Sequence, residues 1–382
     1  WQMPLGNLRL GLDPLSAWFA LAIAFVAALS GFHASGYMED QRASKNLGFF
    51  WFNHLVLTAS MLLVVTARNG ILFLLAWEMM ALSSFFLVMF DHEKTETRKA
   101  GWIYLAATHI GTAFVLGVFA KLGQGLAALD FENFHASGGD AGLIFLMAVV
   151  GFGTKAGFIL LHVWLPEAHP AAPSPVSALL SGVMVKTGIY GLLRTLTFLG
   201  APPEWWGVFL IAVGAFSGVP GVLFALAQHD IKRLLAYHTV ENIGIITLGI
   251  GCGLLGSASG NASMAVFGFA GAVFHVLNHA LFKSLLFLGA GNVVHAVRVR
   301  DIELGGLAKS MPWTAATFLT GSAAISGLPP FNGFVSEFLI YTAAILGILN
   351  AKSALLLGAS LTVIVSLALI GGLAAACFAK AY

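Results

Sequence analysis

Five ionisable side chains lie inside long apolar segments of this chain. Lys155, Lys186 and Lys283 each interrupt a run of apolar residues, and Glu78 and Glu337 add carboxylates in the same kind of setting. A charged side chain at the centre of a bilayer costs about 2.5–3.5 kcal/mol even on permissive insertion scales. Ionisable residues kept at that depth usually line a path for an ion or a proton. The pattern therefore predicts a path through a membrane, and we expect protons to use it.

Lys155 and Lys186 are predicted to lie on separate helices that the linker WLPEAHPAAPSP joins. Removal from water disfavours the ammonium form of a lysine, and a nearby carboxylate favours it. An acid that approaches or withdraws can therefore switch such a lysine between its two forms. Glu78 is our candidate for the acid beside Lys155. The alternative interpretation is a static buried ion pair that only fixes helix packing.

His275, His279 and Lys283 follow one another at intervals of four residues. On a helix this spacing places them on one face. Histidine titrates near neutral pH, so the pattern is typical of a proton relay. Two histidines at this spacing also occur as zinc ligands, but no third ligand lies nearby and the lysine would repel a cation. A third interpretation is that the histidines are hydrogen-bonded core residues.

The segment HDIKRLLAYHTVENIG begins another predicted span. Glu241 lies about two turns into this helix, where it is a candidate interior acid, and His238 is one turn before it as a possible partner. Lys232 is either a solvated anchor at the membrane edge or an interior group. Three further histidines are relay members or helix-end residues: His109, His162 and His169.

The composition indicates a membrane protein. Of the 382 residues, 58% are hydrophobic and only 9% are charged, whereas about a quarter of a soluble protein is charged. The formal net charge of +2 predicts no nucleic-acid partner. Cys252 and Cys377 lie far apart in apolar segments, which excludes a disulfide framework and an iron–sulfur or zinc site built on cysteines. We expect this chain to hold no cofactor and no metal.

About eleven segments are long and apolar enough to cross a bilayer, for which about 20 helical residues are needed. They are residues 14–35, 47–67, 70–90, 100–120, 142–165, 175–198, 206–227, 234–256, 264–294, 313–346 and 353–378. The segments that contain Lys155 and Glu337 look longer than one span and adjoin proline clusters, Pro166 to Pro175 and Pro329–Pro330. Proline interrupts a helix, and broken helices are a feature of transporters.

The distribution of basic residues between alternate loops predicts the orientation. One side would collect eleven lysines and arginines: Arg42, Lys45, Lys94, Arg98, Lys99, Lys232, Arg233, Arg298, Arg300, Lys309 and Lys380. The other would collect five: Arg9, Arg68, Lys121, Arg194 and Lys352. Because cytoplasmic loops are enriched in basic residues, the first side should be cytoplasmic, in a cell's inner membrane, and the visible N-terminus should be outside.

A similar order of elements occurs twice along the chain. We expect an N-terminal helix and loop in residues 1–46, a first repeat in 47–198, and a second repeat with a closing helix in 199–378. Paired interrupted segments in two halves point to binding sites near the bilayer midplane. The chain starts at Trp1 rather than methionine, so we expect a fragment at one or both ends.

Four long motifs, in order, carry a resemblance. They are KAGFILLHVWLPEAHPAAPSPVSALLSGVMVKTGIYGLLR, HDIKRLLAYHTVENIGII, HVLNHALFKSLLFLGAG and ISGLPPFNGFVSEFLIY. Together they resemble the antiporter-like subunits of respiratory complex I, Mrp antiporters and membrane-bound hydrogenases. Within that superfamily, AYHTVENIG is similar to the formate hydrogenlyase and hydrogenase-4 component B branch, because the quinone-reducing complexes usually lack this glutamate.

The resemblance implies an all-α polytopic membrane protein with two inverted five-helix repeats, each with a discontinuous helix, around a hydrated axis of charged residues. Glu78 and Lys155 match the glutamate–lysine pair of the first half, and Lys186 matches the lysine that links the halves. The second-half relay is matched by His275, His279 and Lys283, and the terminal charge near the exit by Glu337.

The expected function is proton translocation as a non-redox subunit of a hydrogenase or complex I-like assembly, with other membrane subunits and a peripheral redox arm as partners. Two alternatives remain. One is an Mrp-type Na⁺/H⁺ antiporter subunit, in which sodium exchange is itself the activity. The other is a structural membrane scaffold with degenerate charges.

Overall fold

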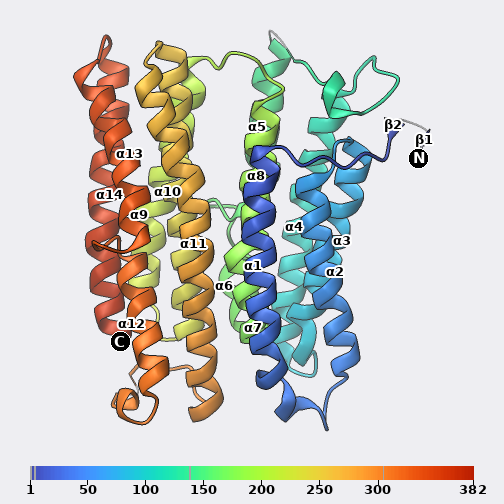
Figure 1. Cartoon of the computed structure of the whole chain (residues 1–382), viewed down its shortest axis with the longest axis vertical. Helices are drawn as coiled ribbons and strands as arrows, with labels where there is room; N and C mark the ends of the chain where they lie inside the picture. Colours follow the sequence, from blue (N-terminus) through green and yellow to red (C-terminus); the bar gives the residue numbers. More distant parts are fainter. Residues whose placement is uncertain (1, 4–5, 137–138, 304) are drawn as a thin grey trace. The chain divides into compact units, whose positions relative to one another are not determined.

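The computed structural model describes residues 2–3, 6–136, 139–303 and 305–382, and most of these are helical. A short antiparallel pair, β1 (Gln2–Met3) and β2 (Gly6–Asn7), precedes the first helix. The chain divides into two compact units, which are drawn in Figure 1. The all-α class expected from the sequence is confirmed.

The first unit comprises Trp1–Gly157 and Leu161–Gly200. Its helices are α1 (Pro14–Tyr37), α2 (Leu47–Thr66), α3 (Gly70–Val88), α4 (Thr95–Leu122), α5 (Gly139–Ala156), α6 (Leu165–Ala171), α7 (Ser174–Leu179) and α8 (Val185–Leu196), with a π-helical turn at Leu180–Met184. Helix α1 packs against α2, α7 and α8 within this unit, and α5 packs against α4 and α8.

The second unit comprises Phe158–Leu160 and Ala201–Tyr382. Its helices are α9 (Glu204–Leu226), α10 (Ile231–Ser259), α11 (Ala262–Val297), α12 (Pro312–Ile325), α13 (Asn332–Leu349) and α14 (Ala354–Ala381). The expected repeats at 47–198 and 199–378 stay a prediction. The inverted relation between the two halves stays a prediction.

Local sequence explains where several helices begin. Asp13, Asn69 and Asp230 each accept hydrogen bonds from backbone N–H groups in the first turn of α1, α3 and α10. The first N–H groups of a helix have no partner within it, so a side-chain oxygen at this position stabilises the start by about 1 kcal/mol. The two short helices within the proline-rich linker, α6 and α7, have proline in their first turn, where the missing N–H costs nothing.

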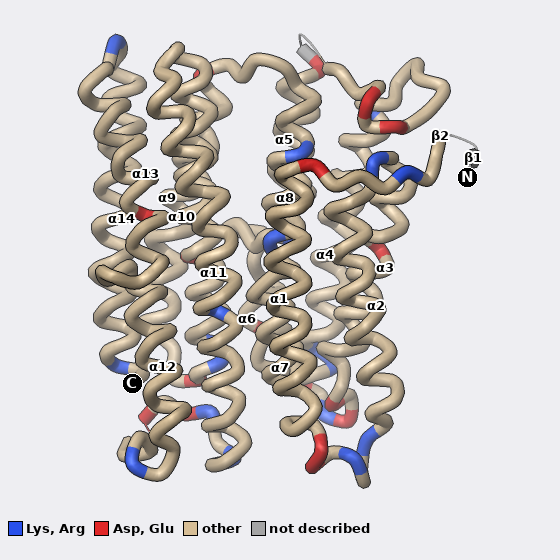
Figure 2. The backbone as a smooth tube through the Cα atoms, in the orientation of Figure 1, with Lys and Arg blue, Asp and Glu red and all other residues tan. Residues whose placement is uncertain are grey.

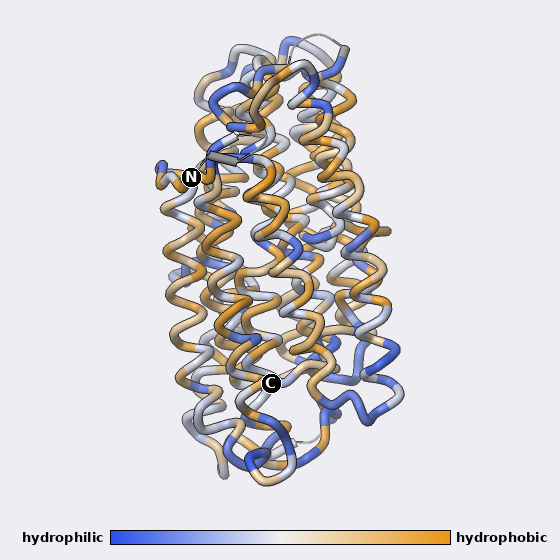
Figure 3. The backbone as a smooth tube through the Cα atoms, turned by 90° about the vertical axis from the view of Figure 1, so that its right-hand side faces the viewer, coloured by the Kyte–Doolittle hydropathy of each residue, from blue (hydrophilic) through white to orange (hydrophobic). Residues whose placement is uncertain are grey.

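In the part of the chain that the structure describes, ten helical segments are long and apolar enough to cross a membrane. Figure 3 shows hydrophobic residues running along the helices and hydrophilic residues gathered in the loops. The charged loops expected on one side, between α1 and α2 and between α3 and α4, lie at the same end of the first unit (Figure 2).

Two predicted spans are wrong in their extent. The segment expected at 142–165 is helical only to Ala156, and the one expected at 313–346 is two helices, α12 and α13. Helix α5 ends because Gly157 has a φ of +88°, a left-handed conformation that glycine adopts without strain. Lys155 therefore lies in the last turn of a broken helix rather than in the middle of a span. The break between α12 and α13 contains Pro329 and Pro330, as expected, whereas the break after α5 contains no proline and Pro166 comes only in the first turn of α6.

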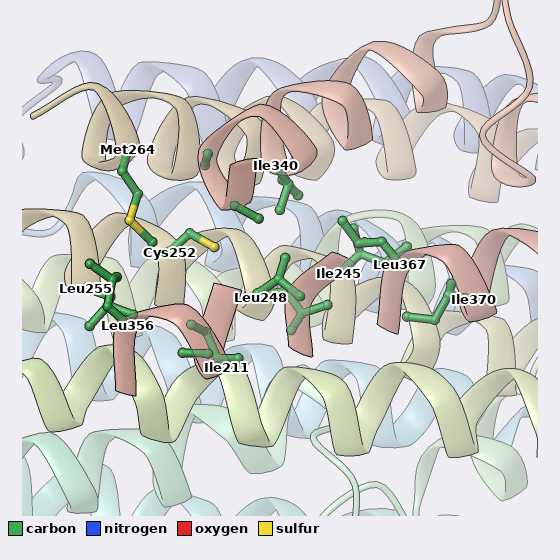
Figure 4. Close-up of a cluster of buried hydrophobic side chains, with 14 residues drawn as sticks. Ile211, Ile245, Leu248, Cys252, Leu255, Met264, Ile340, Leu356, Leu367 and Ile370 are labelled. Atoms are coloured by element: carbon green, nitrogen blue, oxygen red, sulfur yellow. The ribbon is translucent and has the colours of Figure 1, made fainter. Parts of the chain in front are cut away.

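The core of the second unit is formed between α9, α10, α11, α13 and α14. Ile211, Leu248, Met264, Ile340 and Leu367 belong to one continuous cluster of buried apolar side chains there (Figure 4). This packing holds α10, α11 and α13 side by side, and these three helices bear the polar residues described below.

Candidate functional site

Lys155 occupies the broken end of α5. Its side chain is buried, with 3% of the residue exposed. The last carbonyl groups of a helix lack backbone donors and form the negative end of the helix dipole, which favours a cation at this position. One of these carbonyls, that of Thr154, accepts a hydrogen bond of 2.9 Å from the Trp164 indole. The break thus places an amine in a buried, partly compensated environment.

Aromatic rings and hydroxyl groups surround this amine. The Lys155 Nζ atom lies 5.4 Å from the centre of the Trp77 ring and 5.5 Å from that of Tyr104. It also donates a hydrogen bond of 3.4 Å to the Tyr104 hydroxyl, which is in turn hydrogen-bonded to Ser84. Rings at this distance stabilise an ammonium group electrostatically. Sequence reasoning missed all three residues, because aromatic and serine residues in apolar helices resemble ordinary core.

Glu78 does not occupy the expected place beside Lys155. Its carboxylate accepts a hydrogen bond of 2.7 Å from Thr112 and lies 3.5 Å from His109 Nε2 on α4. The Glu78 side chain is 32% exposed and that of His109 is 51% exposed. Within the described structure, the expected contact between Glu78 and Lys155 is absent. The reason is geometric, since burying the neighbouring Trp77 turns Glu78 toward the outside of the unit.

Lys186 lies at the start of α8, directly after the π-helical turn, and is buried. Its Nζ donates a 2.5 Å hydrogen bond to the carbonyl oxygen of Ser181, inside that turn. A π-turn widens the helix and is frequent at functional sites. In this helix, it provides a backbone oxygen for a buried amine, a feature that no local pattern in the sequence indicated.

In the second unit, Glu241 lies against His238, as expected. The two side chains are fully buried and hydrogen-bonded one turn apart on α10. Lys283 on α11 is also fully buried, donates a 2.9 Å hydrogen bond to the Leu235 carbonyl and interacts electrostatically with Glu241. The His238 ring packs on Phe378 of α14, with 4.6 Å between ring centres. This cluster brings an acid, an imidazole and an amine together away from solvent.

His275 is at the centre of a hydrogen-bonded network between three helices. Its Nε2 is 3.0 Å from Asn242 Oδ1 on α10 and its Nδ1 is 2.9 Å from Ser336 Oγ on α13. The Asn278 amide donates to the same Ser336 oxygen at 2.9 Å. The sequence indicated His275 but not its partners, because asparagine and serine are common in helices of every kind.

His279 is fully buried beside His275, with 6.4 Å between the ring centres, and it packs on Phe282 at 5.5 Å. Across the described residues, no group of three or more histidine, cysteine or acidic side chains is arranged to hold a metal ion. The relay interpretation and the hydrogen-bonded core interpretation of His279 both stay predictions.

Glu337 is buried on α13, shortly after the break between α12 and α13. Its carboxylate lies against Gly327, where a Cβ atom would be only 2.7 Å from Oε2. It interacts electrostatically with Glu241. Glu337 therefore belongs to the same unit and the same electrostatic cluster as Glu241 and Lys283.

The remaining candidates are placed as follows. Lys232 is 3% exposed, so it is an interior group rather than a solvated anchor. His169 is fully buried against Trp164, with 6.0 Å between ring centres. His162 is partly buried.

At the N-terminal end of α1, a further polar cluster was not expected from the sequence. Asp13 lies 2.7 Å from Arg194 and 3.2 Å from Arg68, and the Tyr190 hydroxyl accepts a 3.2 Å hydrogen bond from Arg194. Burial opposes ionisation of Asp13, but hydrogen bonds from the Ser16 backbone and from Arg194 outweigh it and hold the pKa of Asp13 below its usual value. This cluster connects α1, α8 and the turn before α3.

The family to which the chain belongs follows from its likeness to known proteins. Residues 67–365 match the family described as NADH:quinone oxidoreductase/Mrp antiporter, TM. The chain belongs to this family. The matched region includes every candidate residue from Glu78 to Glu337, so the expected resemblance is confirmed.

Two individual relatives match most of this chain. The chain is 43% identical over 385 residues to hydrogenase-4 component B of Escherichia coli strain K12, a match that covers 98% of this chain and 56% of the relative. It is 34% identical over 348 residues to Na(+)/H(+) antiporter subunit A1 of Staphylococcus haemolyticus, covering 88% of this chain and 43% of the relative. It therefore spans about half the length of these curated relatives.

The structure of the Mrp complex from Dietzia sp. DQ12-45-1b contains a chain with the same fold. The TM-score is 0.84 at 23% sequence identity, and the match covers 100% of this chain and 67% of the other. This likeness supports the antiporter-type arrangement of helices and, at such low identity, nothing beyond the fold.

Proposed function

We propose that this chain is part of a proton-translocating, antiporter-like membrane subunit of a hydrogenase-type or complex I-like ion pump driven by a redox reaction. The observation that carries the proposal is the set of fully buried titratable groups on membrane-length helices. In the second unit, Lys283, Glu241 and His238 lie together with less than 1% of each residue exposed. Burying such groups is costly unless they are paired, and in membrane proteins they typically mark ion pathways.

Proton transfer in this proposal uses the residues of each unit in turn. Lys155 and Lys186 hold protons in the first unit. Glu78, which contacts Thr112 and His109 rather than Lys155, acts on Lys155 through its longer-range electrostatic field. Glu241, His275, His279 and Lys283 form the relay of the second unit, and Glu337 releases the proton. Coulomb interactions in a medium of low dielectric constant are strong enough to pass a change of charge from one such group to the next.

The chain itself would hold no redox cofactor. Partner membrane subunits and a peripheral redox arm would perform electron transfer and change the charge at one end of the path. We place the assembly in the inner membrane of the cell, with the visible N-terminus outside.

The proposal is tested by measuring proton flux into membrane vesicles that contain the assembled complex. A K⁺ diffusion potential set by valinomycin drives the flux, so the electron donor and acceptor of the complex need not be supplied. We expect Lys155→Met to abolish most of the flux. The matched control is Lys121→Met, because Lys121 is a partly exposed lysine that pairs with Asp140 at a helix end.

Glu78→Gln extends this test to the carboxylate, and native gel electrophoresis shows whether each variant assembles. Normal flux in assembled Lys155→Met and Glu78→Gln vesicles would contradict the roles assigned to these residues.

The second candidate function is Na⁺/H⁺ antiport, which the 34% identity to an antiporter subunit favours. The higher identity to the hydrogenase component supports the first proposal over it. Replacing external Na⁺ with choline separates the two, since only an antiporter requires Na⁺ for proton movement. The identity of neighbouring genes gives an independent indication.

A further inference from the structure

A chain of two hydroxyl groups connects Lys155 with the backbone of α3. Lys155 Nζ contacts the Tyr104 hydroxyl, and that hydroxyl contacts Ser84 Oγ. The Ser84 hydroxyl is also within hydrogen-bond distance of two backbone carbonyls, those of Met80 at 2.6 Å and Ala81 at 3.0 Å. Tyr104 and Ser84 are both fully buried.

Either hydroxyl can donate in the contact between Tyr104 and Ser84, so the chain has two directions. When Lys155 is an ammonium group, it donates to Tyr104, Tyr104 donates to Ser84, and Ser84 donates to the Met80 carbonyl. When Lys155 is a neutral amine, Ser84 rotates and donates to Tyr104, and Tyr104 donates to the lone pair on Nζ. No covalent bond changes between these two arrangements, because only the hydroxyl rotors turn.

We propose that Tyr104 and Ser84 are positioning residues that keep Lys155 hydrogen-bonded in both of its protonation states. The reason such a device is needed is burial. A buried donor without an acceptor costs about 1–3 kcal/mol, and Lys155 is 3% exposed. A single fixed partner would favour one state of the lysine, whereas a reversible pair serves both. This inference rests on the proposed function, in which Lys155 takes up and releases protons.

Other charged groups near this site are engaged elsewhere. Helix α5 packs mainly against α4 and α8, and Trp77 of α3 also contacts it. Glu78 of α3 contacts His109 of α4, and Lys121 pairs with Asp140 at the C-terminal end of α4. Glu96, Arg98 and Lys99 are exposed at the start of α4. On α8, Lys186 donates to the Ser181 carbonyl, and Arg194 donates to the Tyr190 hydroxyl. Tyr104 is thus the hydrogen-bonding side chain from α4 that reaches the Lys155 amine.

The decisive variant is Ser84→Ala. When Lys155 is charged, the Tyr104 hydroxyl donates to Ser84, so this variant removes the acceptor of the Tyr104 proton. When Lys155 is neutral, the Tyr104 hydroxyl donates to Lys155 Nζ, and the variant leaves that acceptor in place. The Met184 sulfur, 3.8 Å from the Tyr104 oxygen, is a weak acceptor and compensates little. The loss disfavours the ammonium state, so the pH of half-maximal proton flux should move downward by roughly half to one unit.

Ser83→Ala is the matched control. Ser83 is the preceding residue on α3, is also buried, and donates to the Met79 carbonyl at 2.7 Å without reaching Tyr104. Its pH profile should coincide with that of the unaltered protein. Tyr104→Phe removes the hydroxyl that accepts a hydrogen bond from charged Lys155 and that donates one to neutral Lys155. Both states of the lysine lose their partner, so the flux should fall several-fold at every pH.

The measurement is proton flux against pH in the vesicles described above. A Ser84→Ala profile that coincides with the Ser83→Ala profile would overturn the inference, as would unchanged flux in Tyr104→Phe. Lys155→Met in the same vesicles distinguishes this failure from failure of the proposed function. If that variant is inactive while Ser84→Ala is unshifted, only the hydroxyl pair is wrong.

Discussion

The contact between Gly327 and Glu337 allows a sharp test of whether the position of one carboxylate controls proton flux. Gly327 lies in the break between α12 and α13 with a φ of +63°. A Cβ atom there would be 2.7 Å from Glu337 Oε2 and 3.1 Å from Cδ. Gly327→Ala should therefore displace the nearer carboxylate oxygen by about 0.8 Å, since attractive contacts lie near 3.5 Å or beyond.

The same substitution also strains the backbone. An alanine in the left-handed region costs about 1–2 kcal/mol relative to glycine, so the thermal stability of the complex should fall. Gly260→Ala separates the two effects. Gly260 has a φ of +72°, ends α10 in the same unit, and has open space where its Cβ would lie. The two variants share the strain, and only Gly327→Ala moves Glu337.

Proton flux and thermal unfolding are then measured on both variants. A displacement of about 1 Å at a reacting group can cost about 100-fold in rate, so a displacement slightly smaller than that should lower the flux in Gly327→Ala by roughly 10- to 50-fold. The flux of Gly260→Ala should stay close to that of the unaltered protein, with a similar loss of stability. Equal flux in the two variants, together with low flux in Glu337→Gln, would refute the claim that the position of this carboxylate matters.

Two further predictions concern stability. Because the pKa of Asp13 is held below its usual value, its ion pairs with Arg68 and Arg194 stabilise the fold above the unfolded pKa, about 3.9, and this contribution is lost as the pH falls through the lower folded value. The melting temperature of the unaltered protein should therefore be higher than that of Asp13→Asn near neutral pH, and the difference between them should disappear below about pH 4. A difference that persists in acid would show that the charge of Asp13 is not responsible. In the second unit, Lys283→Met leaves Glu241 buried without its cation, so the double variant with Glu241→Gln should be more stable than Lys283→Met alone, with a coupling of about 0.5–3 kcal/mol. Additive effects of the two substitutions in thermal or denaturant unfolding would show that the residues do not interact.

The sequence by itself determined the membrane class, the approximate places of the helices and the identity of the buried charges. Hydropathy, proline and glycine act locally, so their effects can be read without knowing the neighbours of a helix. The contact between His238 and Glu241 was also predictable, because residues three apart share a helix face whatever packs against it. Even the two interrupted helices were indicated by nearby prolines, although not the residue at which α5 stops.

Only the tertiary structure decided what lies beside each charge. Successive residues on a helix point about 100° apart, so packing Trp77 into the core turned Glu78 toward His109. The hydrogen-bond partner of the Lys155 amine is instead Tyr104, which in turn contacts Ser84. The partners of His275 on α10 and α13 are likewise set by helices far apart in the chain. Which face of a helix turns inward depends on the total fit between neighbouring surfaces, and for helices that are apolar on nearly every side no local pattern specifies that face.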